Sequence, residues 1–501
     1  MRKKIEELTK KFYTDTPNKL EWILAGIAFF LVGFNMFYGD NIAMFLGYFW
    51  NNTGLLNWST GSLEWMGNNR LPYGIIQQFI GQIWCLPVNI CYKLFGPFEP
   101  ANIWTVWWYK IIIMIFFVLC LKEMCKLAEK AGITQNNSKW MLYIFTTSLL
   151  VCLPVLQVAQ CDAIYIYFAL KGINYYLEDD YRKFLIFMML SIDCKYMAIF
   201  MFIPLVLLKE KRLLFIIRDM IVGVILIPLQ MVWYKIVIVL DKIKRPNTGI
   251  NAAGEAVVES GNYSMTTVSD TLDSEYAGFM SHFYHKTLYF EIPAIRKEYF
   301  ASALIVLFML LCIWCFIRKS GEDRMKDVLF TGFLSMTLLY AMSSPNPYWI
   351  VAMYPVTFIM MYRHPEKLRI NLLLELGYSL TMFLVYLDSM PFVFGGTTNF
   401  NYTPISEWFH IVSGEHTMEN GPTVYGFLSK LGIPSLMPVI VALCLACLIA
   451  WIVINLPTDK IKVVDNIPEK EVLKFQHGVA VFQSLTIIIW FVLCVYCLSR
   501  Y

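Results

Sequence analysis

The sequence predicts an all-α protein that crosses a membrane many times, and three observations lead to that prediction. Of its 501 residues, 58% are hydrophobic and only 16% are charged, whereas a soluble protein of this length carries more charge. Many apolar runs have the ~20 residues that a spanning helix needs. Basic residues gather in short segments between those runs. The net charge of +4 is small, so we expect no nucleic-acid partner.

The first apolar run covers roughly residues 20–38 and follows a basic, polar segment, residues 1–19. The positive-inside rule therefore places the N-terminus in the cytoplasm and residues 39–102 outside. We expect no cleavable signal peptide, because the segment before the run is too polar and no small-residue cleavage site follows it.

Residues 72–95 are apolar but are interrupted by Gln77, Gln82 and Pro87. If this stretch crossed the membrane, the lysines that follow the next span, 103–121, would face outward. If it lies in the interface, those lysines face the cytoplasm. The positive-inside rule and the poor fit of glutamine to a lipid-facing span both favour an interfacial helix.

Spans at about 140–157 and 163–178 are followed by residues 183–208, for which two arrangements are open. This stretch crosses once, or it forms two short helices that turn at Asp193-Cys194-Lys195. With two short helices, nearly all the downstream lysines and arginines fall on the cytoplasmic side, so the pair is favoured. The remaining spans bring the count to thirteen crossings: 213–234, 300–317, 328–342, 348–362, 371–388, 435–455 and 479–498.

Five ionisable residues, far apart in the sequence, lie at or near the outer ends of their predicted helices: Asp40, Lys110, Asp162, Asp193 and Lys195. A charge within a span costs roughly 2.5–3.5 kcal/mol on insertion scales, so each one needs a reason. One interpretation is a shared reaction centre in a water-filled recess on the outer face. The alternative for each residue is an interfacial charge that snorkels to water.

Three motifs occur in order over about residues 20–370. The first is Asp40 after the first span, followed by Leu71-Pro72-Tyr73-Gly74 at the start of the interfacial helix. The second is Gln160-Cys161-Asp162, leading to the Asp193-Cys194-Lys195 turn. The third is Ser343-Ser344-Pro345-Asn346-Pro347-Tyr348-Trp349 before a span. In these motifs the chain resembles the GT-C glycosyltransferases, membrane enzymes that take sugars from polyprenyl-phosphate donors.

The resemblance implies roles for individual residues. Asp40 would be the catalytic base, which takes the proton of the acceptor hydroxyl, and Asp162 would orient the acceptor or a cation, or would cap its helix. Cations and other polar groups would bind the donor and its phosphate. The expected site consists of catalytic Asp40 and Asp162, with substrate-binding Arg70, Tyr73, Lys110, Lys195, His282, His285 and Tyr348.

A metal site is not expected. His282 and His285 are one helical turn apart and could supply half of such a site, but the sequence offers no obvious third ligand. The first loop also lacks the paired acids, Asp-x-Asp or Asp-Glu, that the family carries. A divalent metal is possible in such a family but is not supported here, so we expect no cofactor.

The sequence thus predicts a GT-C-type helical bundle, with a catalytic module at residues 1–390 and a C-terminal loop with two helices at 391–501. Its outer loops would be 39–102 and 235–299. We expect a multi-pass protein of a bacterial-type plasma membrane. It would transfer a hexose or pentose from a polyprenyl-phosphate donor to an envelope glycan or glycolipid hydroxyl on the extracytoplasmic face. The alternatives are a non-catalytic transporter or flippase of a lipid-linked glycan, and an envelope assembly scaffold.

Overall fold

The computed structural model describes residues 13–35, 74–96, 102–229, 232, 289–291, 300–319, 323–342, 347–389, 424–458 and 469–498. Helices make up nearly all of the secondary structure in these ranges. The exception is a short antiparallel pair of strands, β1 (Tyr289–Glu291) and β2 (Phe300–Ser302), within and beside the predicted outer loop 235–299. The predicted all-α class is therefore confirmed, with one small β-ladder added.

The described part of the chain forms helices with the following bounds. They are α2 (Lys19–Asn35), α5 (Ile75–Phe95), α6 (Ile103–Lys130), α7 (Gln135–Thr147), α8 (Leu149–Cys152), the π-helix η1 (Leu153–Gln157), α9 (Asp162–Leu177), α10 (Tyr181–Cys194), η2 (Tyr196–Ala198), α11 (Ile199–Lys209), α12 (Leu213–Val224), α15 (Ala303–Ile317), α16 (Arg324–Met342), η3 (Pro347–Met353), α17 (Tyr354–Arg363), η4 (Pro365–Lys367), α18 (Leu368–Ser389), α20 (Val424–Lys430), η5 (Ile433–Leu436), α21 (Met437–Ile454) and α22 (Glu469–Leu498).

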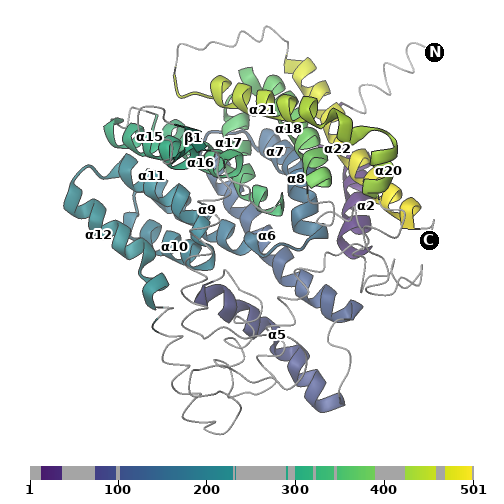
Figure 1. The fold of residues 1–501 in the computed structure, drawn as a ribbon, viewed down its shortest axis with the longest axis horizontal. Coiled ribbons are helices and arrows are strands. Elements are labelled where there is room, and N and C mark those ends of the chain that lie inside the picture. The colour runs from purple at the N-terminus through teal and green to yellow at the C-terminus, as the bar shows by residue number, and fades with distance from the viewer. Residues whose placement is uncertain are drawn as a thin grey trace.

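The helices form one bundle, with α9, α10 and α11 on one side and α18, α21, α22 and α2 on the other (Figure 1). α9 packs against α10 and α6, α18 packs against α21, and α2 packs against α22. α5 lies below the other helices in Figure 1, where it contacts α6 and α10. α5 is the helix that the sequence predicts to lie in the interface.

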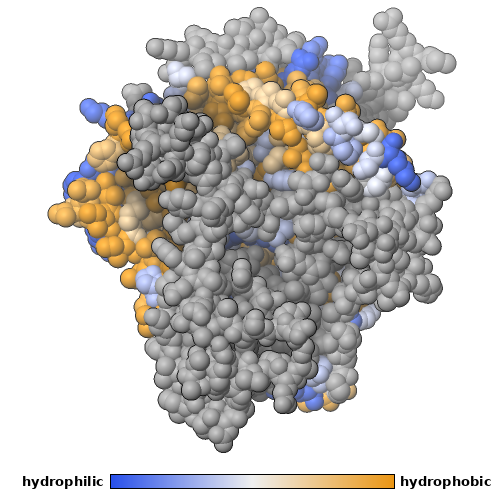
Figure 2. Space-filling model, in the orientation of Figure 1, coloured by the Kyte–Doolittle hydropathy of each residue, from blue (hydrophilic) through white to orange (hydrophobic). Residues whose placement is uncertain are grey.

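The surface of the bundle is apolar. Figure 2 shows hydrophobic residues over α12, α15 and α21, among them exposed Leu214, Ile313 and Leu443. Within the described residues, three helices are long and apolar enough to cross a membrane: Pro365–Leu387, Ile433–Ile454 and Lys470–Tyr496. The protein is therefore an integral membrane protein in character, but the predicted count of thirteen crossings is not confirmed.

The predicted span 140–157 is not one straight helix. α7 and the α8–η1 segment are bent by 68° about Ser148, whose backbone is extended rather than helical. The sequence explains the break, because the Thr147 hydroxyl donates back to the carbonyl of Tyr143 at 2.9 Å. Such back-bonding weakens the helical ladder and bends helices. Pro154 then removes a further backbone donor in the π-helical turn.

The two short helices predicted for residues 183–208 are confirmed as α10 and α11, which are separated by a turn at Lys195. Their far ends meet, since Asp179, just before α10, accepts hydrogen bonds from Lys209 at 2.5 Å and Arg324 at 2.6 Å. These two cations lower the pKa of the Asp179 carboxyl to about 2. Asp179, Lys209 and Arg324 define one end of the bundle, called the basic end below.

Candidate functional site

An ion pair joins the two ends of the second motif. Lys195 Nζ lies 2.5 Å from Asp162 Oδ1, and both side chains are at most 1% exposed. Asp162 is the first residue of α9, while Lys195 adopts an extended conformation directly after α10, so the antiparallel packing of these helices brings the residues together. α9 is about 24 Å long from its 16 residues. The Asp162–Lys195 pair therefore lies at the end of the bundle opposite the basic end.

The third motif contacts the same lysine. Lys195 Nζ lies 4.1 Å from the ring centroid of Trp349 in η3 and 5.6 Å from that of Tyr165 in α9. A desolvated ammonium group over an aromatic ring gains up to about 2 kcal/mol. Tyr348, the neighbour of Trp349, is also buried. Two predicted site residues, Asp162 and Lys195, thus come together with Trp349 and Tyr165. The ring of the third, Tyr348, contacts that of Trp349.

The polar groups around the pair are only partly paired. Asp162 Oδ2, both amide atoms of Gln160 and Gln157 Oε1 are buried and make no hydrogen bond of normal geometry to the described residues. Buried polar groups in native proteins nearly always have a partner, which is a protein group or an ordered water molecule. Gln160 lies within hydrogen-bonding reach of the Asp162 carboxylate. The arrangement is closed, however, because Asp162 and Lys195 face no open recess in the described structure.

Lys110 makes two hydrogen bonds that lie away from the Asp162–Lys195 pair. Its ammonium group donates to the carbonyl of Gly33 at 2.5 Å, near the end of α2, and to that of Leu156 at 3.0 Å in η1. A buried lysine needs such acceptors, and carbonyl groups at the C-terminal end of a helix are favourable ones. Lys110 therefore ties α2 to the segment that leads into Gln160 and Asp162.

Replacing Lys110 by methionine should lower the stability of the fold more than it changes the binding of the expected polyprenyl-phosphate sugar. The substitution keeps the length of the side chain but leaves two buried carbonyls without a donor, at a cost of about 1–3 kcal/mol each. Thermal unfolding of the purified protein in detergent measures this effect, with exposed Lys93→Met as the control. An unchanged midpoint together with a raised KM for the donor would instead return Lys110 to a substrate-binding role.

α5 has its polarity reversed relative to a soluble helix. Gln78, Gln82 and Asn89 are buried, whereas Phe79, Ile83, Ile90 and Leu94 are exposed. An apolar stripe that faces outward at helical spacing fits a lipid-facing helix whose polar face lies toward the protein. The interfacial placement of residues 72–95 stays a prediction.

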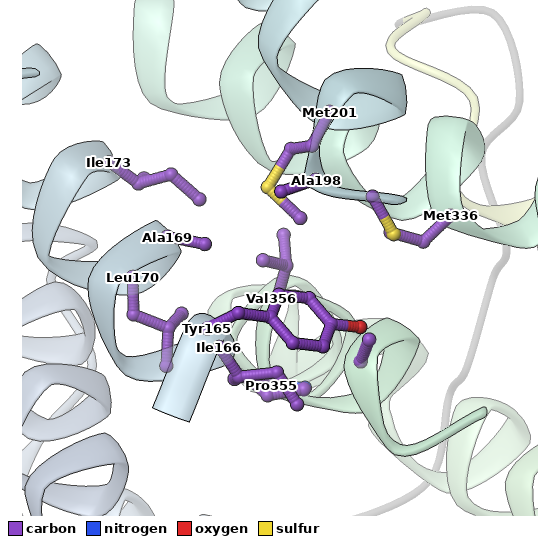
Figure 3. A pocket seen from close by; sticks show the side chains of 11 residues that line it. Tyr165, Ile166, Ala169, Leu170, Ile173, Ala198, Met201, Met336, Pro355 and Val356 are labelled. Atoms are coloured by element: carbon purple, nitrogen blue, oxygen red, sulfur yellow. The ribbon is translucent and has the colours of Figure 1, made fainter. Parts of the chain in front are cut away.

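A small apolar cavity lies one helical turn from Asp162, around Tyr165. Side chains from α9, α11, α16 and α17 converge on it, including Leu170, Met201, Met336 and Val356 (Figure 3). Its volume of about 10 Å³ is room for roughly one water molecule. The cavity cannot hold a sugar, so it is a packing defect beside the Asp162–Lys195 pair.

The other predicted site residues lie outside the described residues: Asp40, Arg70, Tyr73, His282 and His285. Their roles stay predictions. Among the described residues, no group of three His, Cys, Asp or Glu side chains could hold a metal ion. The roles of Trp349 and Tyr165 as partners of Lys195 were missed, since aromatic residues are so frequent in the chain that no sequence signal distinguishes them.

No protein-family model matches the sequence. A search of curated proteins likewise finds no match. Among solved structures, the chain is similar to the crystal structure of ArnT from Cupriavidus metallidurans bound to undecaprenyl phosphate. The two share 11% sequence identity with a TM-score of 0.40, over 96% of this chain and 77% of the other.

Proposed function

We propose that the protein is an integral membrane glycosyltransferase of the GT-C type. It takes a sugar from a polyprenyl-phosphate donor and places it, with inversion, on an acceptor hydroxyl at the extracytoplasmic face. The observation that supports the proposal is the meeting of Asp162, Lys195 and Trp349, which come from two motifs of the resemblance. They lie at the end of the bundle opposite the basic end, where the positive-inside rule places the outer leaflet.

Asp40 acts as the general base in this proposal. It takes the proton of the acceptor hydroxyl as the oxygen attacks C1 of the sugar, and the bond between C1 and the phosphate oxygen breaks. The lipid phosphate leaves with the electron pair, and its charge is met by Arg70, His282 and His285. Asp162 already neutralises the charge of Lys195. The Asp162–Lys195 pair therefore positions the substrate through hydrogen bonds and adds no net charge.

The test is transfer in vitro by the purified protein across a panel of polyprenyl-phosphate sugars. Asp40→Asn should lower kcat by about 10²–10⁴-fold, because general base catalysis contributes that much. Expression and the thermal midpoint should stay unchanged. Asp15→Asn, on the opposite side in the predicted topology, is the matched control. Full activity in Asp40→Asn would reject Asp40 as the base, and no transfer from any donor by the wild-type protein would reject the function.

A further inference from the structure

The start of α5 is held by a residue from a distant part of the chain. Asp193, the penultimate residue of α10, accepts a hydrogen bond through Oδ2 from the backbone N–H of Ile76 at 2.8 Å. The N–H group of Ile75 lies within reach of the same carboxylate. The first N–H groups of a helix have no partner within it, so a carboxylate there acts as a cap. Here the cap comes from 117 residues along the chain.

The backbone of Gly74 also packs closely against Asp193 at the start of α5. A Cβ atom built on Gly74, the residue before α5, would lie 1.9 Å from the carbonyl oxygen of Asp193 and 2.6 Å from its Cγ. No side chain fits at that distance, and moving either backbone segment to make room would break the contact between Gly74 and Asp193. Gly74 is therefore needed for the close approach of the two chains. Gly74 and Asp193 together are called the α5 dock below.

A second contact fixes the middle of α5. The rings of Trp84 in α5 and Trp108 in α6 stack with centroids 4.5 Å apart. Each indole N–H donates to the backbone carbonyl of the other residue at 2.8 Å. With the α5 dock at one end and this tryptophan pair further along, α5 has a fixed position and direction relative to α6 and α10.

The α5 dock is also close in the chain to the candidate site. Asp193 stands two residues before Lys195, the partner of Asp162. On the other side of the dock, Tyr73 directly precedes Gly74, and Arg70 stands four residues before it. The dock thus joins the segment with two predicted donor-binding residues to the turn that carries the Asp162–Lys195 pair.

We propose that Asp193 and Gly74 are positioning residues for the transfer reaction: they fix the start of α5 relative to the turn that carries the Asp162–Lys195 pair. This inference rests on the proposed function. Asp193 acts by accepting backbone hydrogen bonds, and its charge takes no part in the chemistry. An asparagine can accept the same bonds, and an alanine cannot.

Hydrogen exchange provides a test of the α5 dock that needs no substrate. Asp193→Ala should speed exchange in the first turn of α5 on the order of 10-fold, as expected for the loss of a helix cap. Gly74→Ala should speed it at least as much. Asp193→Asn should leave exchange within about 3-fold of the wild type. Gly26→Ala, where nothing lies within 4 Å of the added methyl group, is the control.

Kinetics of the same variants test the positioning role. Asp193→Ala and Gly74→Ala should raise the KM for the polyprenyl-phosphate donor on the order of 10-fold, whereas Asp193→Asn should stay near the wild-type value. Equal loss of kcat in the Asn and Ala variants, with normal exchange in the Asn variant, would overturn the proposal in favour of a catalytic carboxylate. Unchanged exchange in Asp193→Ala would overturn the dock itself.

The two proposals fail in different ways. If the wild-type protein transfers no sugar, the proposed function is rejected and the positioning role is rejected with it, yet the exchange results still decide whether the α5 dock exists. If the wild-type protein is active and Asp193→Ala changes exchange without changing KM or kcat, only the positioning role is rejected.

Discussion

Lys195→Met is expected to destabilise the protein by about 3–5 kcal/mol, because it leaves Asp162 as a buried charge without a partner. Asp162 is fully buried, and Lys195 is its ion-pair partner at 2.5 Å. The variant also removes the cation that lies over the ring of Trp349, 4.1 Å from its centroid. Both the yield of folded protein and the thermal midpoint in detergent should fall, and transfer activity should disappear.

The double variant Asp162→Leu/Lys195→Met separates stability from function. Replacing both members of a buried pair by apolar residues is often neutral or stabilising, so the thermal midpoint should recover most of the loss. Activity should not recover, because the hydrogen-bonding groups of Asp162 are gone. If the double variant is as active as the wild type, the Asp162–Lys195 pair has no role in the reaction. If Lys195→Met alone is as stable as the wild type, the pair does not form.

The meeting of Asp162 and Lys195 could be predicted in part, because the positions of the lysines and arginines indicate which helix ends lie on the same side of the membrane. The positions of the lysines and arginines favoured two short helices over residues 183–208, and that choice placed Asp162 and Lys195 at the same end. The structure confirms the helix pair and brings the two residues into contact. The glutamines in residues 72–95 also indicated an interfacial helix. α5 has these glutamines buried, and its placement relative to the membrane stays a prediction.

The rest depends on contacts between distant residues, which a single sequence does not contain. The pair was expected to line an open recess, but the side chain that neutralises Asp162 also helps to close the site. The 68° bend at Ser148 was missed because hydropathy is the same for a bent and a straight apolar helix. The α5 dock was missed because the sequence does not show that Asp193 packs against Gly74.

Glu375 is a buried acid that lies outside the candidate site. It lies in α18, is fully buried, and accepts hydrogen bonds from Ser148 at 2.6 Å, Ser379 at 2.7 Å and Gln483 at 3.0 Å. Ser148 is the residue at the 68° bend, and Gln483 belongs to α22. Glu375 therefore joins the bend to two long helices, and a satisfied network of this kind fixes one arrangement of the helices.

Glu375→Ala should cost about 3–5 kcal/mol of stability, because three buried donors lose their acceptor. Glu375→Gln should cost less, about 1–2 kcal/mol, since one amide oxygen still accepts while the new NH₂ group faces the donor of Gln483. Thermal unfolding measures both values. Glu366→Gln, at an exposed carboxylate in η4, is the control and should unfold like the wild type.

Glu375→Gln also tests the alternative that the protein is a transporter. An acid within an apolar helix is where a transporter would place a functional charge, and α18 coincides with one of the helices able to span a membrane. If Glu375 only holds the bend, the folded fraction of Glu375→Gln should transfer sugar at the wild-type rate per molecule. If the wild-type protein moves a lipid-linked glycan across a vesicle membrane, and Glu375→Gln is equally stable but moves none, the charge is functional. The structural role would then be wrong, and transport would be the better account of this chain.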